Sequence, residues 1–358
     1  MYKRQILYGE LYTKYKSEII KQVESKTDID CSKLKRSKAN DVIIPCSGET
    51  AVDIATARCV PFDNILLGGD LNIISLHKYD GAFMSYQLNG KRKYDIARVA
   101  QGVSVVHLYG EHLKAIKTYN PSLPEQQKIA KLLSLIDERI ATQNKIIEKL
   151  QSLIKGLNDN IHKGIKGETV CFSDLGEAYS GLSGKGGDDF GYGEPFITYM
   201  NVHQNTYISE KDYELVQIVP NEKQNSVQYS DALFTLSSET PEEVGIGAVY
   251  LGNTQKLYLN SFCFGIHFYD ERVLPQYLAH FISSSSFRKA IYPLAQGSTR
   301  FNLQKKDFMK MKFLLPSLEK QGRIANTLDA LHCRLANEKS LMEQYILLKK
   351  YLLSQMFI

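Results

Sequence analysis

Two long stretches of the chain carry apolar residues at intervals of three and four, the spacing of an amphipathic helix. The first, residues 125–161, contains no proline and a single glycine, Gly156. Pro121 and Pro124 stand just before it, where proline is tolerated, and Ser122 is a candidate cap. At about 1.5 Å per residue, the pattern predicts a helix of roughly 55 Å.

The second apolar stretch, residues 324–356, repeats this pattern and is interrupted by polar residues at Glu338 and Lys349. Helices of this length exceed the width of a small domain, so each stripe needs a partner. Each helix could pack on its own domain, but pairing of the two as an antiparallel coiled coil is favoured. Gln143, the break in the first stripe, aligns with Glu338, and the two would help to set the register. The predicted interface consists of Ile129, Leu133, Ile136, Ile140, Ile147, Leu150, Leu157, Ile324, Leu328, Leu331, Leu335, Met342 and Leu352.

The helices belong to an internal repeat. Pro121-Ser-Leu recurs as Pro316-Ser-Leu, and at the same offset of 195 Gln126 matches Gln321. Upstream, Ala100-Gln-Gly matches Ala295-Gln-Gly. Further back the offset drifts to 190, where the Ser-Gly-Glu-Thr at 47–50 resembles the Ser-Ser-Glu-Thr at 237–240. The chain is therefore expected to be a tandem duplication of a globular segment followed by a long helix.

Short apolar runs alternate with turn residues in both globular segments, among them 42–45, 65–69, 196–199 and 258–262. Helical patterns lie between them, notably at 271–292. The prediction is an α+β protein with a pseudo-two-fold repeat, in which two mixed α/β domains are joined by the antiparallel helices. The first domain is expected to be short at its start, because residues 169–190 have no counterpart in it. The predicted boundaries are 1–118 and 168–315 for the domains, and 119–167 and 316–358 for the helical segments.

The charge is unevenly distributed. The formal net charge of +5 is too small to indicate a partner, and residues 168–315 alone carry 12 basic and 17 acidic side chains. However, 286–312 carries seven basic residues and one acidic residue, and the equivalent window 91–117 carries six and two. Both copies thus concentrate positive charge at one place in the repeat.

Each basic window contains the Ala-Gln-Gly element, followed by small hydroxyl, amide or basic side chains. A glycine turn permits close approach of the backbone, and these side chains suit phosphates and base edges. A solvated helix face and an ordinary turn would explain either window alone, but their repetition favours contact with nucleic acid. The candidate DNA-binding residues are Lys91, Arg92, Lys93, Ser104, Thr299, Arg300, Asn302, Lys305 and Lys306.

Signatures of catalysis, metal binding and membrane insertion are missing from the sequence. The six cysteines form no C-x-x-C pair, the histidines form no cluster, and neither a P-loop nor a nucleophile elbow is present. No run of eighteen apolar residues and no secretory signal occurs. The expectation is a cytoplasmic, non-catalytic protein without a metal, which acts as a binding module or a scaffold.

The repeated segment at the start of each helix resembles a known family. Pro121-Ser-Leu-Pro-Glu-Gln-Gln-Lys-Ile-Ala130 and its echo, Pro316-Ser-Leu-Glu-Lys-Gln-Gly-Arg-Ile-Ala325, are similar to the spacer of type I restriction-modification specificity subunits. The order of domain, long helix, domain, long helix also resembles that family. The second copy departs from the first at Lys320, where the first has Glu125, and at Gly322, where it has Gln127.

The resemblance implies a DNA-recognition subunit with no catalysis of its own. Each globular domain would be a target-recognition domain that reads one half of a bipartite, asymmetric DNA site, and the helix pair would set the spacing. The implied partners are double-stranded DNA, two methyltransferase subunits and the restriction/translocase subunits. S-adenosylmethionine, ATP and Mg would bind to those partners and not to this chain. The alternatives are a coiled-coil scaffold that does not bind DNA and, less favoured because its motifs are missing, a stand-alone nuclease or methyltransferase.

Overall fold

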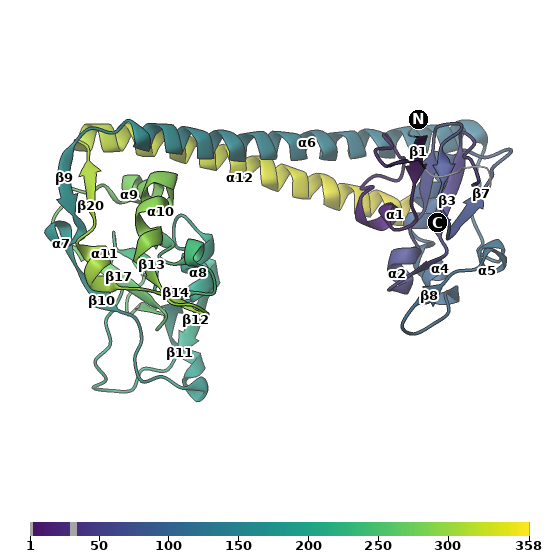
Figure 1. The fold of residues 1–358 in the computed structure, drawn as a ribbon. Helices are drawn as coiled ribbons and strands as arrows, with labels where there is room; N and C mark the ends of the chain where they lie inside the picture. Colours follow the sequence, from purple (N-terminus) through teal and green to yellow (C-terminus); the bar gives the residue numbers. More distant parts are fainter. Residues whose placement is uncertain (1–2, 29–33, 358) are drawn as a thin grey trace. The chain divides into compact units, whose positions relative to one another are not determined.

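The computed structural model describes residues 3–28 and 34–357 of the chain (Figure 1). It divides into two compact units. The first comprises Met1–Ile147 and Asn337–Ile358, and the second comprises Glu148–Ala336. Each unit contains one mixed α/β segment and a stretch of both long helices.

The two long helices are α6, Leu123–Lys163, and α12, Leu318–Gln355. Both begin earlier than their apolar stripes. In α6 the first turn includes Pro124, because proline is compatible with that turn of a helix. Glu125 accepts the backbone N–H of Ser122 at 3.1 Å and its hydroxyl at 2.6 Å, which caps the start of α6. None of the helices in the described part of the chain is long and apolar enough to span a membrane.

The repeated glutamine of the Pro-Ser-Leu segment ties each long helix to its globular segment. The Gln126 side chain is buried, accepts the Asp80 N–H at 2.9 Å and donates to the Pro121 carbonyl at 2.8 Å. Gln321 is equally buried, accepts the Leu274 N–H at 2.7 Å and donates to the Pro316 carbonyl at 2.9 Å. Asp80 and Leu274 each stand immediately before a helix of the globular segment. The sequence match at these positions therefore reflects one repeated joint.

The described residues of the first unit form three small sheets with strand orders β2-β1-β6, β5-β3-β7 and β4-β8. Its core is formed by β3, whose five residues are all buried, and by α3, which is buried over most of its length. The elements before α6 are β1 (Lys3–Ile6), α1 (Glu10–Thr13), β2 (Lys26–Thr27), β3 (Asp41–Pro45), β4 (Ser47–Gly48), α2 (Ala51–Ile54), β5 (Arg58–Val60), β6 (Leu66–Leu67), β7 (Leu71–Ile74), α3 (Gly81–Asn89), α4 (Lys93–Val99), β8 (Val106–His107) and α5 (Gly110–Lys114).

The second unit contains sheets of order β10-β17-β13-β15, β12-β11-β16, β14-β19-β18 and β20-β9. A cluster of phenylalanines on β13, β17 and the helices fills its core. The elements between α6 and α12 are β9 (Glu168–Cys171), α7 (Phe172–Leu175), β10 (Gly176–Ser180), η1 (Gly187–Asp189), β11 (Phe190–Ile197), α8 (Tyr199–Gln204), η2 (Glu210–Asp212), β12 (Tyr213–Val216), β13 (Ala232–Thr235), β14 (Ser237–Ser238), η3 (Pro241–Glu243), β15 (Gly247–Val249), β16 (Tyr258–Leu259), β17 (Cys263–Phe268), α9 (Pro275–Ser283), α10 (Ser285–Ile291), η4 (Tyr292–Leu294), β18 (Ala295–Gln296), β19 (Phe301–Leu303), α11 (Lys305–Met309) and β20 (Lys312–Leu315).

The duplication read from the sequence is also present in the strand pairing. The sheet β5-β3-β7 has the same order and antiparallel pairing as β15-β13-β17. Likewise β1 pairs with β2 antiparallel and with β6 in parallel, as β11 does with β12 and β16. The two units therefore share one topology over most of their length.

The units differ where the sequence lacks a counterpart. Residues 169–190 contribute β9, α7 and β10 to the second unit, and β10 extends the main sheet beyond β17. Among the described residues of the first unit, β7 is an edge strand that pairs with β3 alone.

The helical pattern over 271–292 forms two helices and not one. Ser284, whose backbone is extended, separates α9 from α10, and its hydroxyl accepts the Phe287 N–H at 3.3 Å. The side chain of Ser284 thus caps α10, which the apolar periodicity could not indicate.

In the first unit the long helices run antiparallel and touch at their matched polar positions. Gln143 donates to the backbone carbonyl of Glu338 at 3.0 Å and to its carboxylate. Both side chains are buried, and they occupy the same place in the two copies of the repeat. Nearby, Ile129 and Leu133 pack with the end of α12 and with Phe83 of α3.

In the second unit the apolar stripes also meet the globular core. Ile324 and Leu328 of α12 lie in the main core cluster, against which Leu157 of α6 packs. Every residue of the predicted helix-pair interface is buried or half-buried. The sequence left open whether each helix packs on its own domain or on the other helix. Both kinds of packing occur, because the ends of the helices pack on globular segments and Gln143 contacts the opposite helix.

A buried ion cluster fixes the end of α12 in the first unit. The Lys349 ammonium lies 2.7 Å from the Asp137 carboxylate of α6 and also binds Glu18, which precedes β3 in the chain. Tyr86 of α3 donates to Asp137 at 2.7 Å. Burial raises the pKa of Glu18, and the nearby ammonium opposes that rise. Lys349 therefore bridges two buried carboxylates from different segments of the chain, and the buried Arg58 guanidinium adds positive charge nearby.

Replacing Lys349 by methionine is expected to destabilise the first unit by about 3–5 kcal/mol, because two buried carboxylates then lose the ammonium between them and keep only the Arg58 guanidinium nearby. Since burial already raises the pKa of Glu18 and the loss of the ammonium would raise it further above that of the unfolded chain, the loss of stability should grow as the pH is raised from 5 to 8. The measurement is chemical denaturation of both proteins at the two pH values.

The matched control is Lys350→Met on the exposed face of the same helix. Equal losses for the two variants, or a loss that shrinks as the pH rises, would contradict the role given to Lys349.

Candidate nucleic-acid interface

The repeated Ala-Gln-Gly element forms the same hairpin in both units. In the first, Gln101 and His107 exchange backbone hydrogen bonds of 2.9 and 2.7 Å, and β8 pairs with β4. In the second, Gln296 pairs with Asn302, and β19 pairs with β14. Because β4 and β14 contain the matched residues 47–48 and 237–238, each hairpin is held by the other repeated motif.

A glycine shapes each hairpin loop. Gly102 and Gly297 have φ angles of +121° and +143°, which L-residues with side chains rarely adopt. A Cβ atom at Gly102 would lie 2.1 Å from the Val105 carbonyl oxygen, and one at Gly297 would lie 2.1 Å from that of Arg300. The repeated glycine is thus required by the loop geometry.

The tips of the two hairpins differ although their frames agree. The first exposes Val103, Ser104 and Val105, whereas the second exposes Thr299 and Arg300. A constant frame with exposed and variable tip residues is typical of a recognition loop on a rigid scaffold. Of the predicted contacts, Ser104, Thr299 and Arg300 lie at these tips. Asn302 is exposed on β19, next to the tip of the second hairpin.

Arg300 borders a hollow of about 370 Å³ in the second unit. Its guanidinium carbon lies 5.3 Å from the centre of the Phe262 ring, a cation–π contact that restrains the side chain. Glu239 and Glu243 line the same hollow, so it presents both a fork of donors and carboxylate acceptors. Such a mixture suits the edges of bases better than phosphates, which the carboxylates would repel.

The remaining candidates of the second unit follow directly on the hairpin. Lys305 and Lys306 open α11, where Lys305 is half-buried and donates to the Ser180 hydroxyl at 2.6 Å. Lys306 is exposed. The five candidates of the second unit thus lie in one short segment, 299–306, as they already do in the sequence.

The candidates of the first unit are less concentrated. Lys91 is exposed, whereas Arg92 and Lys93 are half-buried at the start of α4, and Arg92 pairs with Asp95 at 3.4 Å. Burial, and then the nearby Arg58 guanidinium, lower the pKa of Lys93. These three residues lie on the α3–α4 junction and not on the hairpin with Ser104, so their contact with DNA stays a prediction.

Not all of the basic window is available for a ligand. The half-buried Arg288 guanidinium donates to the carbonyls of Glu242, Val244 and Gly245 at 2.6–2.7 Å. It fixes the loop that carries Glu243, a lining residue of the hollow. Arg288 therefore positions this loop, and its hydrogen bonds to the protein leave it less available to a ligand.

Several residues beside Arg300 could not be found from the sequence. Tyr199, His203 and Phe262 line its hollow but come from distant segments without a distinctive local pattern. The only signal was the repeated Ser-x-Glu-Thr motif, which contributes Ser237, Ser238 and Glu239 to the same hollow.

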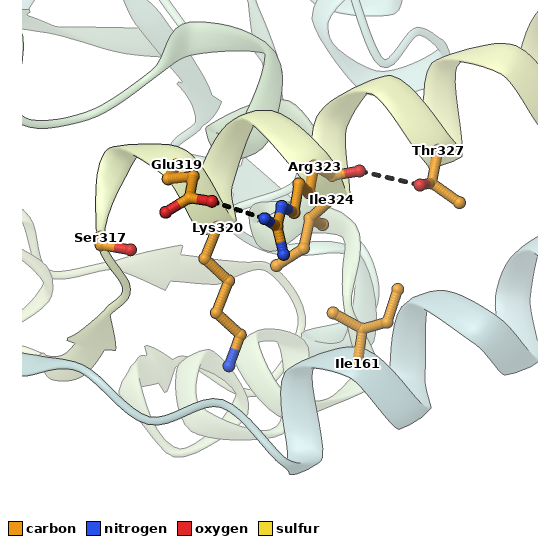
Figure 2. Close-up of a pocket in the computed structure, with 7 residues that line it drawn as sticks. All are labelled: Ile161, Ser317, Glu319, Lys320, Arg323, Ile324 and Thr327. Atoms are coloured by element: carbon orange, nitrogen blue, oxygen red, sulfur yellow. Dashed lines mark hydrogen bonds and ion pairs between the residues drawn. The ribbon is translucent and has the colours of Figure 1, made fainter.

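A second hollow, of about 460 Å³, lies where the end of α6 meets the start of α12 (Figure 2). Lys320 and Ile161 line it, and Arg323 is paired with Glu319 one helical turn away. Lys320 replaces the acidic cap Glu125 of the first copy, so this departure from the repeat lies at a helix start, away from the hairpin. In the part of the chain that the structure describes, no cluster of three His, Cys, Asp or Glu side chains could hold a metal ion.

Comparison with known proteins agrees with the repeat. A family model for the type I restriction modification DNA specificity domain matches residues 11–152 and again 167–344. The specificity subunit of the type I restriction enzyme MjaVIII from Methanocaldococcus jannaschii is 22% identical over 342 residues, which cover 88% of this chain and 77% of that protein.

Two solved structures share the fold. The S subunit of a type I restriction-modification system from M. genitalium aligns with a TM-score of 0.54 at 15% identity, over 99% of this chain and 92% of that one. A chain from a study of complex assembly and conformational transition in the type I R-M system aligns with a TM-score of 0.57 at 14% identity, over 99% and 90%. With the family model matching both copies of the repeat, the chain belongs to the type I restriction-modification DNA specificity family.

Proposed function

We propose that the chain is the DNA-specificity subunit of a type I restriction-modification complex, and that each globular segment reads one half of a bipartite, asymmetric DNA site. The observation that carries this proposal is the hairpin, which has the same frame and a different tip in each unit. Two half-sites of different sequence require this combination, because the frame places the loop and the tip selects the base.

The proposed contacts divide into two kinds. Exposed lysines such as Lys306 and Lys91 would neutralise phosphates and position each domain. Arg300, held over the Phe262 ring, would donate to a base edge in the major groove, where arginine pairs with guanine. Ser104, Thr299 and Asn302 can contact bases or phosphates, and Lys93, Arg92 and Lys305 would add to the positive field.

The helix pair would set the distance between the two half-sites. At about 1.5 Å per residue, the 41 residues of α6 span roughly 60 Å. That length is somewhat more than one and a half turns of B-DNA, at about 34 Å per turn.

The helix pair would also dock two methyltransferase subunits, with the restriction/translocase subunits joining this assembly. Leu347, Leu348 and Tyr351 support this proposal, because they form an apolar patch on α12 that is 44–63% exposed. Such patches on a soluble surface mark interaction sites. Catalysis, with S-adenosylmethionine, ATP and Mg, would belong to those partners in the cytoplasm, and this chain would contribute recognition alone.

Removing one charge at a time tests the DNA contacts in the complex assembled with the modification subunits. Lys306→Gln should lower the slope of log Kobs against log salt by about 0.9, the value for one phosphate. Arg300→Gln should instead weaken binding to the specific duplex by about 1–3 kcal/mol, as expected for a base contact. Fluorescence anisotropy at four salt concentrations measures both quantities.

Lys211→Gln, an exposed lysine outside the basic window, is the control. If Lys211→Gln lowers the salt slope as much as Lys306→Gln does, the assignment of the interface is wrong. If the complex shows no salt-linked affinity for any duplex, the scaffold alternative holds.

Replacing Leu347 and Tyr351 by serine should weaken assembly with the modification subunit at least tenfold, about 1.4 kcal/mol, while the thermal unfolding midpoint of the free chain stays unchanged. Assembly should weaken because these apolar side chains would be buried against the modification subunit, and serine would lose that burial. Mass photometry of the mixture at graded concentrations gives the dissociation constant.

Tyr269→Ser is the matched control, since Tyr269 in the second unit is 63% exposed and Tyr351 is 62% exposed. A similar loss for this control would show that exposed apolar residues in general, and not the α12 patch, support assembly.

A further inference from the structure

The repeated Ser-x-Glu-Thr motif contains a glutamate to which the fold gives no partner, Glu49 in the first copy and Glu239 in the second. Both glutamates are exposed, and no hydrogen bond or ion pair joins either of them to the residues that the structure describes. Other members of the motif have structural roles. Its first serine lies in β4 or in β14, and Thr50 caps α2 by accepting the Asp53 N–H at 3.1 Å. A loop residue that is repeated without a structural role indicates a function.

In the second unit the strand pairing places this glutamate opposite Arg300. The last pair of β14 and β19 is Ser238↔Phe301, so Glu239 and Arg300 come next across the hairpin. Side chains directly opposite each other in an antiparallel pair lie on the same face, and both of these line the hollow of about 370 Å³. Glu243 also lines it but already accepts the Ser238 hydroxyl at 3.0 Å. Glu239 is therefore the carboxylate beside the arginine that is available to a ligand.

In the first unit the same register places the glutamate opposite a valine. The last pair of β4 and β8 is Gly48↔Val106, so Glu49 and Val105 come next across the hairpin. The offset of 195 equates Val105 with Arg300. The Val105 side chain is 53% exposed, so this tip offers apolar surface where the other offers a cation. The two hairpins thus keep the glutamate and differ in the residue opposite it.

The major groove of DNA offers these residues different partners. A carboxylate only accepts hydrogen bonds, and the donors in that groove are the amino groups of cytosine and adenine, one in every base pair. A glutamate therefore selects the strand on which the amino base lies, but not the type of base pair. The residue opposite it makes that choice, because arginine donates to O6 and N7 of guanine, whereas an apolar side chain contacts the methyl group of thymine.

We propose, on the basis of the DNA-reading role proposed above, that the glutamate and the residue opposite it read one base pair together in each half-site. Glu239 accepts from cytosine while Arg300 donates to the guanine of the same G·C pair. Glu49 accepts from adenine while Val105 contacts the thymine methyl group of the same A·T pair. The half-site of the second unit therefore contains a G·C pair at the hairpin tip, and that of the first unit contains an A·T pair.

The test exchanges the two opposite residues in the chain assembled with its modification subunits. The probe is a library of duplexes with a randomised centre, and sequencing of the bound duplexes gives the base preference at each position. Val105→Arg should change one position of one half-site from A·T to G·C. Arg300→Val should change one position of the other half-site from G·C to A·T. If either variant binds with an unchanged preference at every position, the proposal is overturned.

Two further variants, Glu239→Ala and Glu49→Ala, test whether each glutamate reads the same base pair as the residue opposite it. Each should reduce the preference at that one position at least fivefold, because the amino group loses its acceptor. Glu214→Ala, which removes an exposed glutamate on β12, is the matched control and should change no position. A reduction at a different position, or one that the control shares, would contradict the pairing of the two residues.

Base analogues test the proposal without changing the protein, so they decide even where a variant fails to fold. Uracil in place of the thymine removes one methyl group and should weaken binding about fourfold. In the other half-site, 7-deazaguanine removes N7 of guanine and should weaken binding at least fivefold. Equal affinity for the natural and the modified duplexes would overturn the proposal.

The library also separates this inference from the proposed function. If the unaltered complex enriches no bipartite sequence, the proposed function itself fails. An enriched bipartite site that lacks a G·C pair in one half or an A·T pair in the other contradicts the reading pairs alone. In each variant the unaltered half-site reports whether the chain is folded and assembled, since its preference should stay as it was.

Discussion

The need to bury the apolar stripes of α6 and α12 is the constraint on which the rest of the structure depends. Each stripe is too long for one globular segment, so it packs partly on that segment and partly beside the other helix. Gln126 and Gln321 then fix how each helix leaves its globular segment, through the same two kinds of hydrogen bond. A rigid joint of this kind would suit a recognition loop, because the position of such a loop depends on how its globular segment is attached to the helix.

The sequence predicts the helices, the repeat and the family well, because each rests on a pattern that many residues share. The signal for the long helices is a periodicity over more than thirty positions, and that of the repeat is a constant offset. Prediction from the sequence fails where a single side chain decides where a helix begins or ends. Ser284, for example, divides one predicted helix into two. The sequence also does not predict the contact of Phe262 with Arg300, because that contact depends on how distant loops fold.

Charge at the candidate interface illustrates the same limit. Counting basic residues picks out one window in each copy, but the count treats all cations alike. Arg288 donates to three carbonyls of its own unit, and Arg92 pairs with Asp95, whereas Lys306 is exposed. Burial and hydrogen bonding, which separate a positioning residue from a candidate contact, exist only in the folded chain.

The contact of Gln143 with Glu338 has a consequence for how chains of this kind associate. If the α12 helices of two molecules paired with each other about the same position, Glu338 would face Glu338, and two buried carboxylates would repel. The glutamine in one copy and the glutamate in the other make the pairing of α6 with α12 favourable and the pairing of two α12 helices unfavourable. A single difference between the duplicated halves thus opposes the association of two molecules through like helices.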